Sequence, residues 1–342
     1  MLRSLSRTQA LVAILALLAL AGFSLTIRPA PEDAAITGDG RYSDVRLYED
    51  IAGALAAGEP YYRAATRLHR AHGFPTQPFV TVRLPTLAWA EAALGWPAMR
   101  AILAALLGAS ALAWLAALRG TVAPAERIAA TLLVLAGGAM AARADLVVTH
   151  ELWAGVLVSL AAALLAGGRW LPAVFAAALA VAVREMALPF ALVAALLALR
   201  DRDWPQVAAW GALLLAGAAM LLLHKLAVDP LSQPGDALSQ GWSGLRGAGA
   251  PLRDLVDVTL LGLLPRPFAY LVALLAIAGF LAAPPPLARI ALAWLAVVCL
   301  MLGVFARPVN FYWAILAIPT VLAGLAFVPR LVGDLAHAVR RR

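Results

Sequence analysis

Long apolar runs separated by short polar segments dominate the chain. A helix that crosses a membrane needs roughly 20 apolar residues. Segments that meet this length predict spans near 9–27, 97–118, 124–142, 151–168, 206–226, 265–283, 288–306 and 309–328. The apolar stretch 170–199 is interrupted by Arg184–Glu185 and then Pro189, which predicts two shorter spans, 170–183 and 186–199, meeting at a turn. The pattern predicts an all-α polytopic membrane protein with about ten transmembrane helices in one domain, 1–342.

The amino-acid composition also indicates that lipid surrounds much of the chain. Hydrophobic residues make up 63% of the 342 residues and charged residues 13%, whereas a soluble domain is about half apolar and a quarter charged. Arg3 and Arg7 precede an apolar run, so Met1–Thr26 is interpreted as an uncleaved signal anchor. The single cysteine, Cys299, cannot form an intramolecular disulfide.

The distribution of arginine predicts the orientation. With the N-terminus in the cytoplasm, the short outer turns carry only Arg143, Arg184 and Arg307, whereas the inner segments carry Arg3, Arg7, Arg119, Arg127, Arg169, Arg200, Arg202, Arg289, Arg330 and Arg340–Arg342. This is the positive-inside bias, and it predicts a multi-pass protein of the cytoplasmic (inner) membrane with both termini in the cytoplasm. The formal charge of +8 is therefore a topology signal. No basic face with interleaved aromatics predicts a nucleic-acid partner.

Two long outer loops, 28–83 and 227–264, then hold most of the polar chemistry. Of the 19 acidic residues, four are inside and fifteen fall in outer loops or at outer ends of spans. Ser43–Gly58 reads as an amphipathic helix on which Asp44, Tyr48, Ile51 and Leu55 share one face. Two interpretations fit this helix start: Asp44 is a catalytic carboxylate, or Ser43 or Asp44 is simply the N-cap of the helix.

Other polar groups lie at the outer ends of spans. Arg143, Asp145, His150–Glu151, Arg184–Glu185 and Arg307–Asn310 form this set. Ionisable groups at membrane depth usually face a cavity or each other, so Arg184–Glu185 is interpreted either as a structural ion pair or as a ligand site. His150–Glu151 fits a substrate contact, a catalytic helper or the polar cap of a span.

Several catalytic signatures are missing from the sequence. It contains no P-loop and no strand-borne G-x-G-x-x-G, so an ATP-driven pump and a nucleotide-binding fold are not expected. His69-x-x-His72 has close spacing, but no further His or Cys nearby completes a zinc set.

The first outer loop resembles the GT-C membrane glycosyltransferases, most closely glycosyltransferase family 87. Ser43-Asp44-Val45-Arg46-Leu47-Tyr48, then Ala54-Leu55 and Gly58-Glu59-Pro60-Tyr61, is similar to that family's Asp-x-x-x-Tyr…Leu-x-x-Gly-x-x-Tyr pattern. Phe79…Leu84-Pro85-Thr86-Leu87 followed by Leu94-Gly95-Trp96 is similar to the run that leads into its second span, with Arg83-Leu84-Pro85 where aromatic-Pro-Pro is usual.

The resemblance implies a GT-C-like bundle and a reaction on the outer face. Such enzymes move a sugar, here a hexose such as mannose, from a polyprenyl-phosphate donor to a lipid or glycan acceptor. The family's general base maps onto Asp44, and the motif tyrosine, Tyr48, is expected at the substrate.

The chemistry of that reaction selects further candidates. A departing phosphate needs fixed cations, and the arginine fork matches phosphate oxygens; the candidates are Arg41, Arg83, Arg184 and Arg307. Sugar hydroxyls would be held by His150, Glu151, Glu185 and Asn310. One base without a second nucleophile predicts inversion at the anomeric carbon, and neither a metal nor another cofactor is expected.

Two other classes of function remain open from the sequence. A transporter or lipid flippase could use the Arg184–Glu185–Pro189 interruption, although no internal repeat of the kind transporters carry is visible. A non-catalytic membrane subunit is the other.

Overall fold

The computed structural model describes residues 2–29, 43–139 and 146–340, and this part of the chain is helical. Its only β-type pairing is a single bridge between Gln77 and Leu238. In chain order the helices are η1 (Leu2–Ser4), α1 (Arg7–Thr26), α2 (Asp44–Ala56), α3 (Tyr61–Ala71), η3 (Phe79–Thr81), α4 (Thr86–Ala117), α5 (Pro124–Gly137), α6 (His150–Ala166), α7 (Trp170–Val183), η6 (Glu185–Ala187), α8 (Leu188–Arg200), α9 (Trp204–Val228), η7 (Asp229–Leu231), α10 (Gly249–Asp257), η8 (Leu260–Leu263), α11 (Arg266–Gly279), η9 (Phe280–Ala282), α12 (Pro285–Leu300), the π-helix η10 (Met301–Phe305), η11 (Pro308–Ala317), α13 (Thr320–Ala323), η12 (Gly324–Phe327) and α14 (Val328–Arg340). The prediction of an all-α protein is confirmed for these residues.

Five helical segments of the described chain are long and apolar enough to cross a membrane. They are Arg7–Thr26, Phe79–Ala117, Trp204–Leu231, Pro285–Phe305 and Thr320–Arg340. Large apolar side chains on them and on their neighbours face outward; Leu215 is 75% exposed and Leu223 67%. Water would penalise this surface at roughly 25 cal/mol per Å², so the chain is a membrane protein.

Helices also lie in the other predicted apolar segments, but α6, α7 and α11 are shorter. The number of crossings therefore stays a prediction. The last predicted segment, 309–328, is a single span in the sequence pattern and a broken one in the structure. The 3₁₀-helix η11 ends before Pro319, and an α-helix begins again at Thr320, because proline has no N–H to continue the hydrogen-bond ladder.

The helix α6 forms the centre of the bundle, because it packs against α4, α7, α12 and η11 and is buried along nearly its whole length. Its Ser159 hydroxyl accepts a hydrogen bond from Trp114 Nε1 at 3.0 Å. Gly155 lets η11 approach closely, since a Cβ there would lie 2.6 Å from the carbonyl oxygen of Ile315. The same close contact sets the position of the N-terminal end of α6, where His150 and Glu151 lie.

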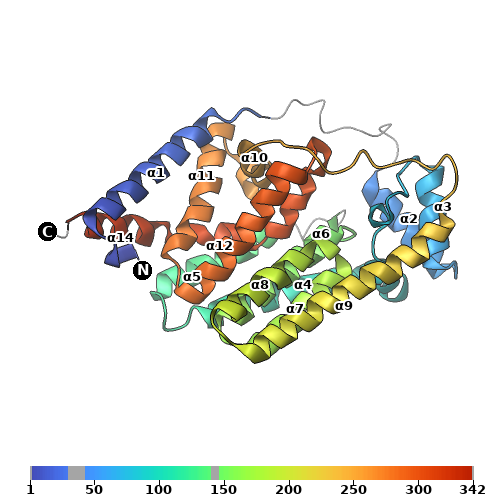
Figure 1. Cartoon of the computed structure of the whole chain (residues 1–342), viewed down its shortest axis with the longest axis horizontal. Coiled ribbons are helices and arrows are strands. Elements are labelled where there is room, and N and C mark those ends of the chain that lie inside the picture. Colours follow the sequence, from blue (N-terminus) through green and yellow to red (C-terminus); the bar gives the residue numbers. More distant parts are fainter. Residues whose placement is uncertain (1, 30–42, 140–145, 341–342) are drawn as a thin grey trace.

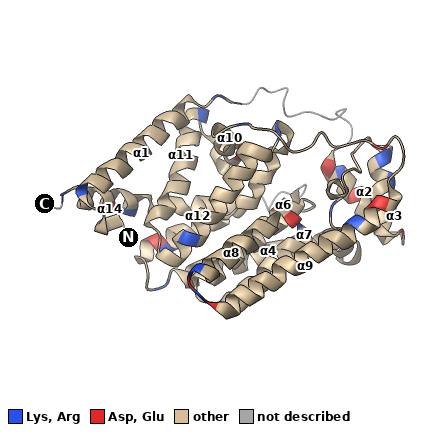
Figure 2. Ribbon diagram, in the orientation of Figure 1, with Lys and Arg blue, Asp and Glu red and all other residues tan. Residues whose placement is uncertain are grey.

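A small polar unit, α2 and α3, lies at one end of the bundle, and both described termini lie at the other (Figure 1). On α2 the buried positions are Leu47, Ile51 and Ala52, so one face of this helix packs against the protein. Gly58 follows it at φ +92°, a conformation that glycine adopts without steric cost. Charged residues gather toward the ends of the helices, whereas the long apolar stretches between them carry few (Figure 2).

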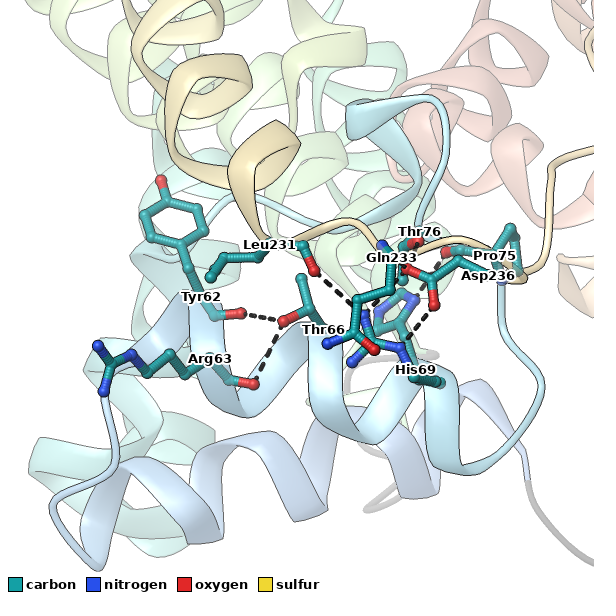
Figure 3. Close-up of polar contacts among 10 residues, drawn as sticks. Tyr62, Arg63, Thr66, His69, Pro75, Thr76, Leu231, Gln233 and Asp236 are labelled. Carbon is teal, nitrogen blue, oxygen red and sulfur yellow. Dashed lines mark hydrogen bonds and ion pairs between the residues drawn. The ribbon is translucent and has the colours of Figure 1, made fainter.

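The two long loops are joined by an ion pair (Figure 3). Arg70 Nε on α3 donates to Asp236 Oδ1 at 2.5 Å, and its Nη2 donates to Oδ2 at 3.0 Å. The Thr76 hydroxyl and the Gln233 amide also donate to Oδ2, each at 2.9 Å. The Asp236 side chain is 2% exposed. This carboxylate therefore fixes α3 to the segment that follows α9.

We expect Asp236→Ala to lower the free energy of unfolding by about 2 kcal/mol, because hydrogen bonds to a buried charged group contribute about 1.5–3 kcal/mol. Thermal unfolding of the detergent-solubilised protein measures the loss, and limited proteolysis after Arg70 and Arg246 reports loosening of the loops. Asp257→Ala is the control, because that carboxylate forms a largely exposed pair with Arg266 and should change stability little. Equal effects of the two substitutions would contradict the role of Asp236.

Candidate active site

Asp44 is the first residue of α2, and it does not cap the helix. The N-cap is Ser43, whose hydroxyl accepts a hydrogen bond from the Arg46 amide at 3.3 Å. A helix N-terminus also favours a negative charge. The capping role that competed with catalysis in the sequence is thus filled by Ser43, and the Asp44 carboxylate is available for another partner.

The Arg83 side chain contacts residues of three helices, α2, η11 and α6. Its Nε donates to the Tyr48 hydroxyl at 3.0 Å, and its Nη2 donates to the Tyr312 hydroxyl at 3.3 Å. The same Nη2 lies 3.9 Å from Glu151 Oε1. Two tyrosines from distant parts of the chain therefore orient one guanidinium group.

The backbone around Arg83 is fixed independently of its side chain. The Tyr61 hydroxyl donates to the Arg83 carbonyl at 2.6 Å. His224 Nε2, on α9, lies 2.9 Å from the Val82 carbonyl. Because a carbonyl oxygen can only accept, His224 is the donor. Contacts from α3 and α9 thus hold the strand-like segment that presents Arg83.

A buried ion network lies between α6 and the turn from α7 to α8. Arg184 Nε is 2.8 Å from Glu151 Oε1, and Nη1 donates to Glu185 Oε1 at 2.5 Å. Arg184 and Glu151 are each 2% exposed. The turn predicted at Arg184–Glu185 is present, since α7 ends at Val183 and Arg184 adopts an extended conformation. The guanidinium group is occupied by two carboxylates, which favours the structural ion pair over a ligand site for Arg184.

His150 connects this network to α2. Its ring meets that of Tyr48 edge-to-face, with centroids 5.0 Å apart. The preceding residue, Thr149, makes no side-chain cap bond to α6. At this end of α6, His150 contacts Tyr48, and Glu151 lies near Arg83 and Arg184.

The pKa of Asp44 shows that this residue belongs to the same cluster. The carboxylate is exposed at the helix start, yet the surrounding protein removes enough water to raise its pKa above the ordinary 3.8. Arg83 lowers this pKa and Glu151 raises it, so both groups lie within electrostatic reach of Asp44. The net shift is upward.

The structure thus brings together seven of the candidates: Asp44, Tyr48, Arg83, His150, Glu151, Arg184 and Glu185. Arg307 instead donates to Gln240 Oε1 at 2.5 Å, and the Asn310 side chain accepts from the Arg307 amide at 3.2 Å. Arg41, Arg143 and Asp145 lie outside the described residues.

Sequence reasoning missed Tyr312 and His224 as parts of this site. Tyr312 starts the last apolar segment, where an aromatic is expected at a membrane interface for any function. His224 lies inside the apolar run of α9. Neither has a motif neighbour, so only packing could show that Tyr312 reaches Arg83 and that His224 reaches the Val82 carbonyl beside it.

Among the described residues no group of three or more His, Cys, Asp or Glu side chains could hold a metal ion. The chain matches no known protein-family model, no curated protein and no solved structure. The arrangement itself therefore carries the functional argument.

We expect Arg184→Met to lower the free energy of unfolding by about 3–5 kcal/mol, since it leaves Glu151 as a buried carboxylate without its closest cation. The double variant Arg184→Met/Glu151→Leu should lose less than the sum of the two single losses. Thermal unfolding of all three variants completes the double-mutant cycle.

The matched control for this cycle is Arg289→Met. Arg289 pairs with Asp201 at 2.8 Å, but their side chains are 37% and 47% exposed, and such pairs contribute about 0–1 kcal/mol. Strict additivity of the Arg184 and Glu151 losses would show that the two side chains do not stabilise each other.

Proposed function

We propose that this protein is a polyprenyl-phosphate-sugar-dependent glycosyltransferase of GT-C type. It would move a hexose such as mannose from the lipid donor to a lipid or glycan acceptor on the outer face of the cytoplasmic membrane. One observation carries the proposal: Asp44 is released from capping by Ser43 and lies within electrostatic reach of Arg83, which Tyr48 and Tyr312 orient.

The proposed step uses Asp44 as general base. The carboxylate takes the proton of an acceptor hydroxyl, whose oxygen bonds to the anomeric carbon of the sugar. The bond from that carbon to the donor phosphate breaks, and the phosphate leaves with the electron pair. With a single displacement, the configuration at the anomeric carbon inverts.

Arg83 is the described arginine best suited to the leaving phosphate. Its two hydrogen-bond partners, Tyr48 and Tyr312, are neutral phenols, and Glu151, 3.9 Å away, lies closer to Arg184 than to Arg83. Arg184 is instead neutralised by carboxylates on two sides. A fixed cation stabilises charge that develops in the transition state, and we assign this role to Arg83, with Arg184 holding Glu151 in place.

The proposed topology has ten spans, both termini in the cytoplasm, and the loops 28–83 and 227–264 outside. The arginine bias supports it. The placement of both described termini at the end opposite α2 and α3 also supports it (Figure 1). Asp44 would then face the compartment in which a polyprenyl-linked donor is used.

A transporter or flippase is the second candidate, because a buried charged turn separates the short helices α7 and α8. Broken helices with ionisable groups are typical of transport sites. The two candidates differ in outcome: a transferase consumes the donor and yields a new glycoside, whereas a flippase moves the donor between leaflets unchanged.

We expect Asp44→Asn to reduce sugar transfer by at least about 100-fold, since general acid–base catalysis contributes about 10²–10⁴ in rate. The assay reconstitutes the purified protein in vesicles with a panel of labelled polyprenyl-phosphate hexoses and follows which one is consumed. Turnover by Asp44→Asn at the wild-type rate would remove Asp44 from the mechanism.

The matched control is Asp50→Asn on the same helix. Asp50 pairs with Arg46, its Oδ1 lying 3.1 Å from Arg46 Nε, and its loss should leave turnover within about two-fold, as for an exposed pair. Gel-filtration profiles and unfolding temperatures of both variants show that the comparison is between folded proteins. No consumption of any donor by the wild-type protein, together with donor movement between leaflets, would favour the flippase.

The pH profile of transfer should have an acid limb above the ordinary carboxyl value of 3.8, because only ionised Asp44 can accept a proton and its pKa is raised. Lowering the pH through that pKa protonates the base and lowers kcat/KM. Glu151→Gln removes a negative charge that raises this pKa, so the limb should move to lower pH. A limb that moves upward in this variant would contradict the assignment.

A further inference from the structure

A small polar cavity lies behind the candidate active site. Its volume is about 10 Å³, close to the space that one water molecule requires. The side chains that line it come from α2, α3, the segment before α4, α4 and α6, and they are Tyr48, Ile51, Tyr61, His69, Arg83, Ala88, Glu91 and His150. Six of these eight side chains carry polar atoms, and buried polar atoms cost free energy unless they find hydrogen-bond partners.

The tautomer of His69 follows from its neighbour. Its Nδ1 lies 2.9 Å from the Pro75 carbonyl oxygen, as Figure 3 shows. Since a carbonyl can only accept, Nδ1 carries the proton. Burial lowers the pKa of His69 to about 4, so the ring is neutral at pH 7. Its Nε2 is then an acceptor, buried and without a hydrogen-bond partner among the described residues.

Glu91 is a buried carboxyl group without a described ion pair. It is 5% exposed, and Oε1 has no hydrogen-bond partner in the described part of the chain. The charged group that acts on it from α2 is Glu49, which repels a negative charge. Arg83 lines the same cavity, but its guanidinium hydrogen bonds go to Tyr48 and Tyr312. In its acid form this carboxyl carries one O–H donor.

His150 is the third polar residue, after His69 and Glu91, that we consider at this cavity. It is 3% exposed, and neither ring nitrogen makes a hydrogen bond of regular geometry within the described residues. The Leu84 carbonyl interacts with its ring from the segment that presents Arg83. A neutral imidazole offers one donor and one acceptor.

We propose that this cavity binds one water molecule, held by the Glu91 carboxyl, by His69 Nε2 and by His150. The Glu91 hydroxyl donates to the water oxygen, and one water hydrogen is donated to His69 Nε2. The second water hydrogen goes to the acceptor nitrogen of His150. The three protein groups thereby gain partners, and α3, α4 and α6 are joined behind Tyr48 and Arg83. Glu91 is a positioning residue in this arrangement, and the assignment does not depend on sugar transfer.

The charge of the site distinguishes a water from a cation. His69 and His150 are neutral ligands, and a neutral Glu91 contributes no charge to hold a metal ion. Arg83, a fixed cation, lines the same space. An uncharged molecule with two donors and two acceptors matches the available groups, whereas a cation would meet an arginine.

Two measurements test the proposal on the full-length protein in nanodiscs. A high-resolution structure should show density for one water within hydrogen-bond distance of Glu91, His69 and His150. The infrared difference spectrum between wild type and Glu91→Gln at pH 7 should show loss of a carboxylic-acid carbonyl band. Direct contact between Glu91 and His69 with no density between them, or loss of a carboxylate band instead, would overturn it.

Amide exchange separates positioning from general stability. Glu91→Gln keeps a neutral donor and should preserve the protection of amides in α3. Glu91→Leu removes the donor that holds the water, so His69 Nε2 loses the water that donates to it, and we expect α3 amides to exchange on the order of tenfold faster. Glu59→Leu is the control, because Glu59 pairs with Arg67 at the surface. Wild-type protection in Glu91→Leu would contradict the positioning role; should that variant fail to fold, the density and the infrared band still decide.

Discussion

A charged group enclosed by apolar helices has to find its counter-charge within the protein, because lipid supplies none. In this chain the constraint is met at the turn between α7 and α8, where Arg184 lies between Glu151 and Glu185. The pairing determines where α6 begins relative to α7, and therefore where His150 and Glu151 are presented. The rest of the polar cluster is arranged around that fixed point.

The cluster has two layers with different tasks. Arg184 is bound by two carboxylates and holds α6 against the turn between α7 and α8. Arg83 is instead hydrogen-bonded to the uncharged phenols of Tyr48 and Tyr312. Asp44 stands at the solvent side of this second layer, on a helix whose cap is made by Ser43. A carboxylate at the surface and an oriented cation behind it fit the proposed reaction, in which a hydroxyl is deprotonated as a phosphate departs.

The polar end of the molecule is held by contacts that span the sequence. The ion pair of Arg70 with Asp236 joins α3 to the loop after α9, and His224 on α9 holds the backbone before Arg83. These contacts are hydrogen bonds with directional geometry, so they constrain orientation as well as distance. The candidate site, to which the loop 28–83 contributes Asp44, Tyr48 and Arg83, therefore rests on helices from the whole chain.

The sequence by itself determined the solvent of this protein and the helices that follow from it. Apolar run length specifies a membrane helix because backbone polar groups in lipid must pair locally; accordingly α7 coincides with the predicted segment 170–183. The same pattern located α2 and the glycine that ends it. At 309–328 it missed the break, because Pro319 interrupts a run that is apolar on both sides. It also placed the start of one span at residue 97, whereas α4 begins at Thr86.

Which polar residues share a site was decided by the tertiary structure alone. Asp44, Arg83, Glu151 and Tyr312 are separated by long stretches of chain, and their meeting depends on how α2, α6 and η11 pack. The same packing turned Arg307 toward Gln240 and enclosed Glu91 beside His69, two outcomes that no local pattern encodes. Helix formation is a local property of the backbone, whereas the partner of a charged side chain is chosen by contacts between helices distant in sequence.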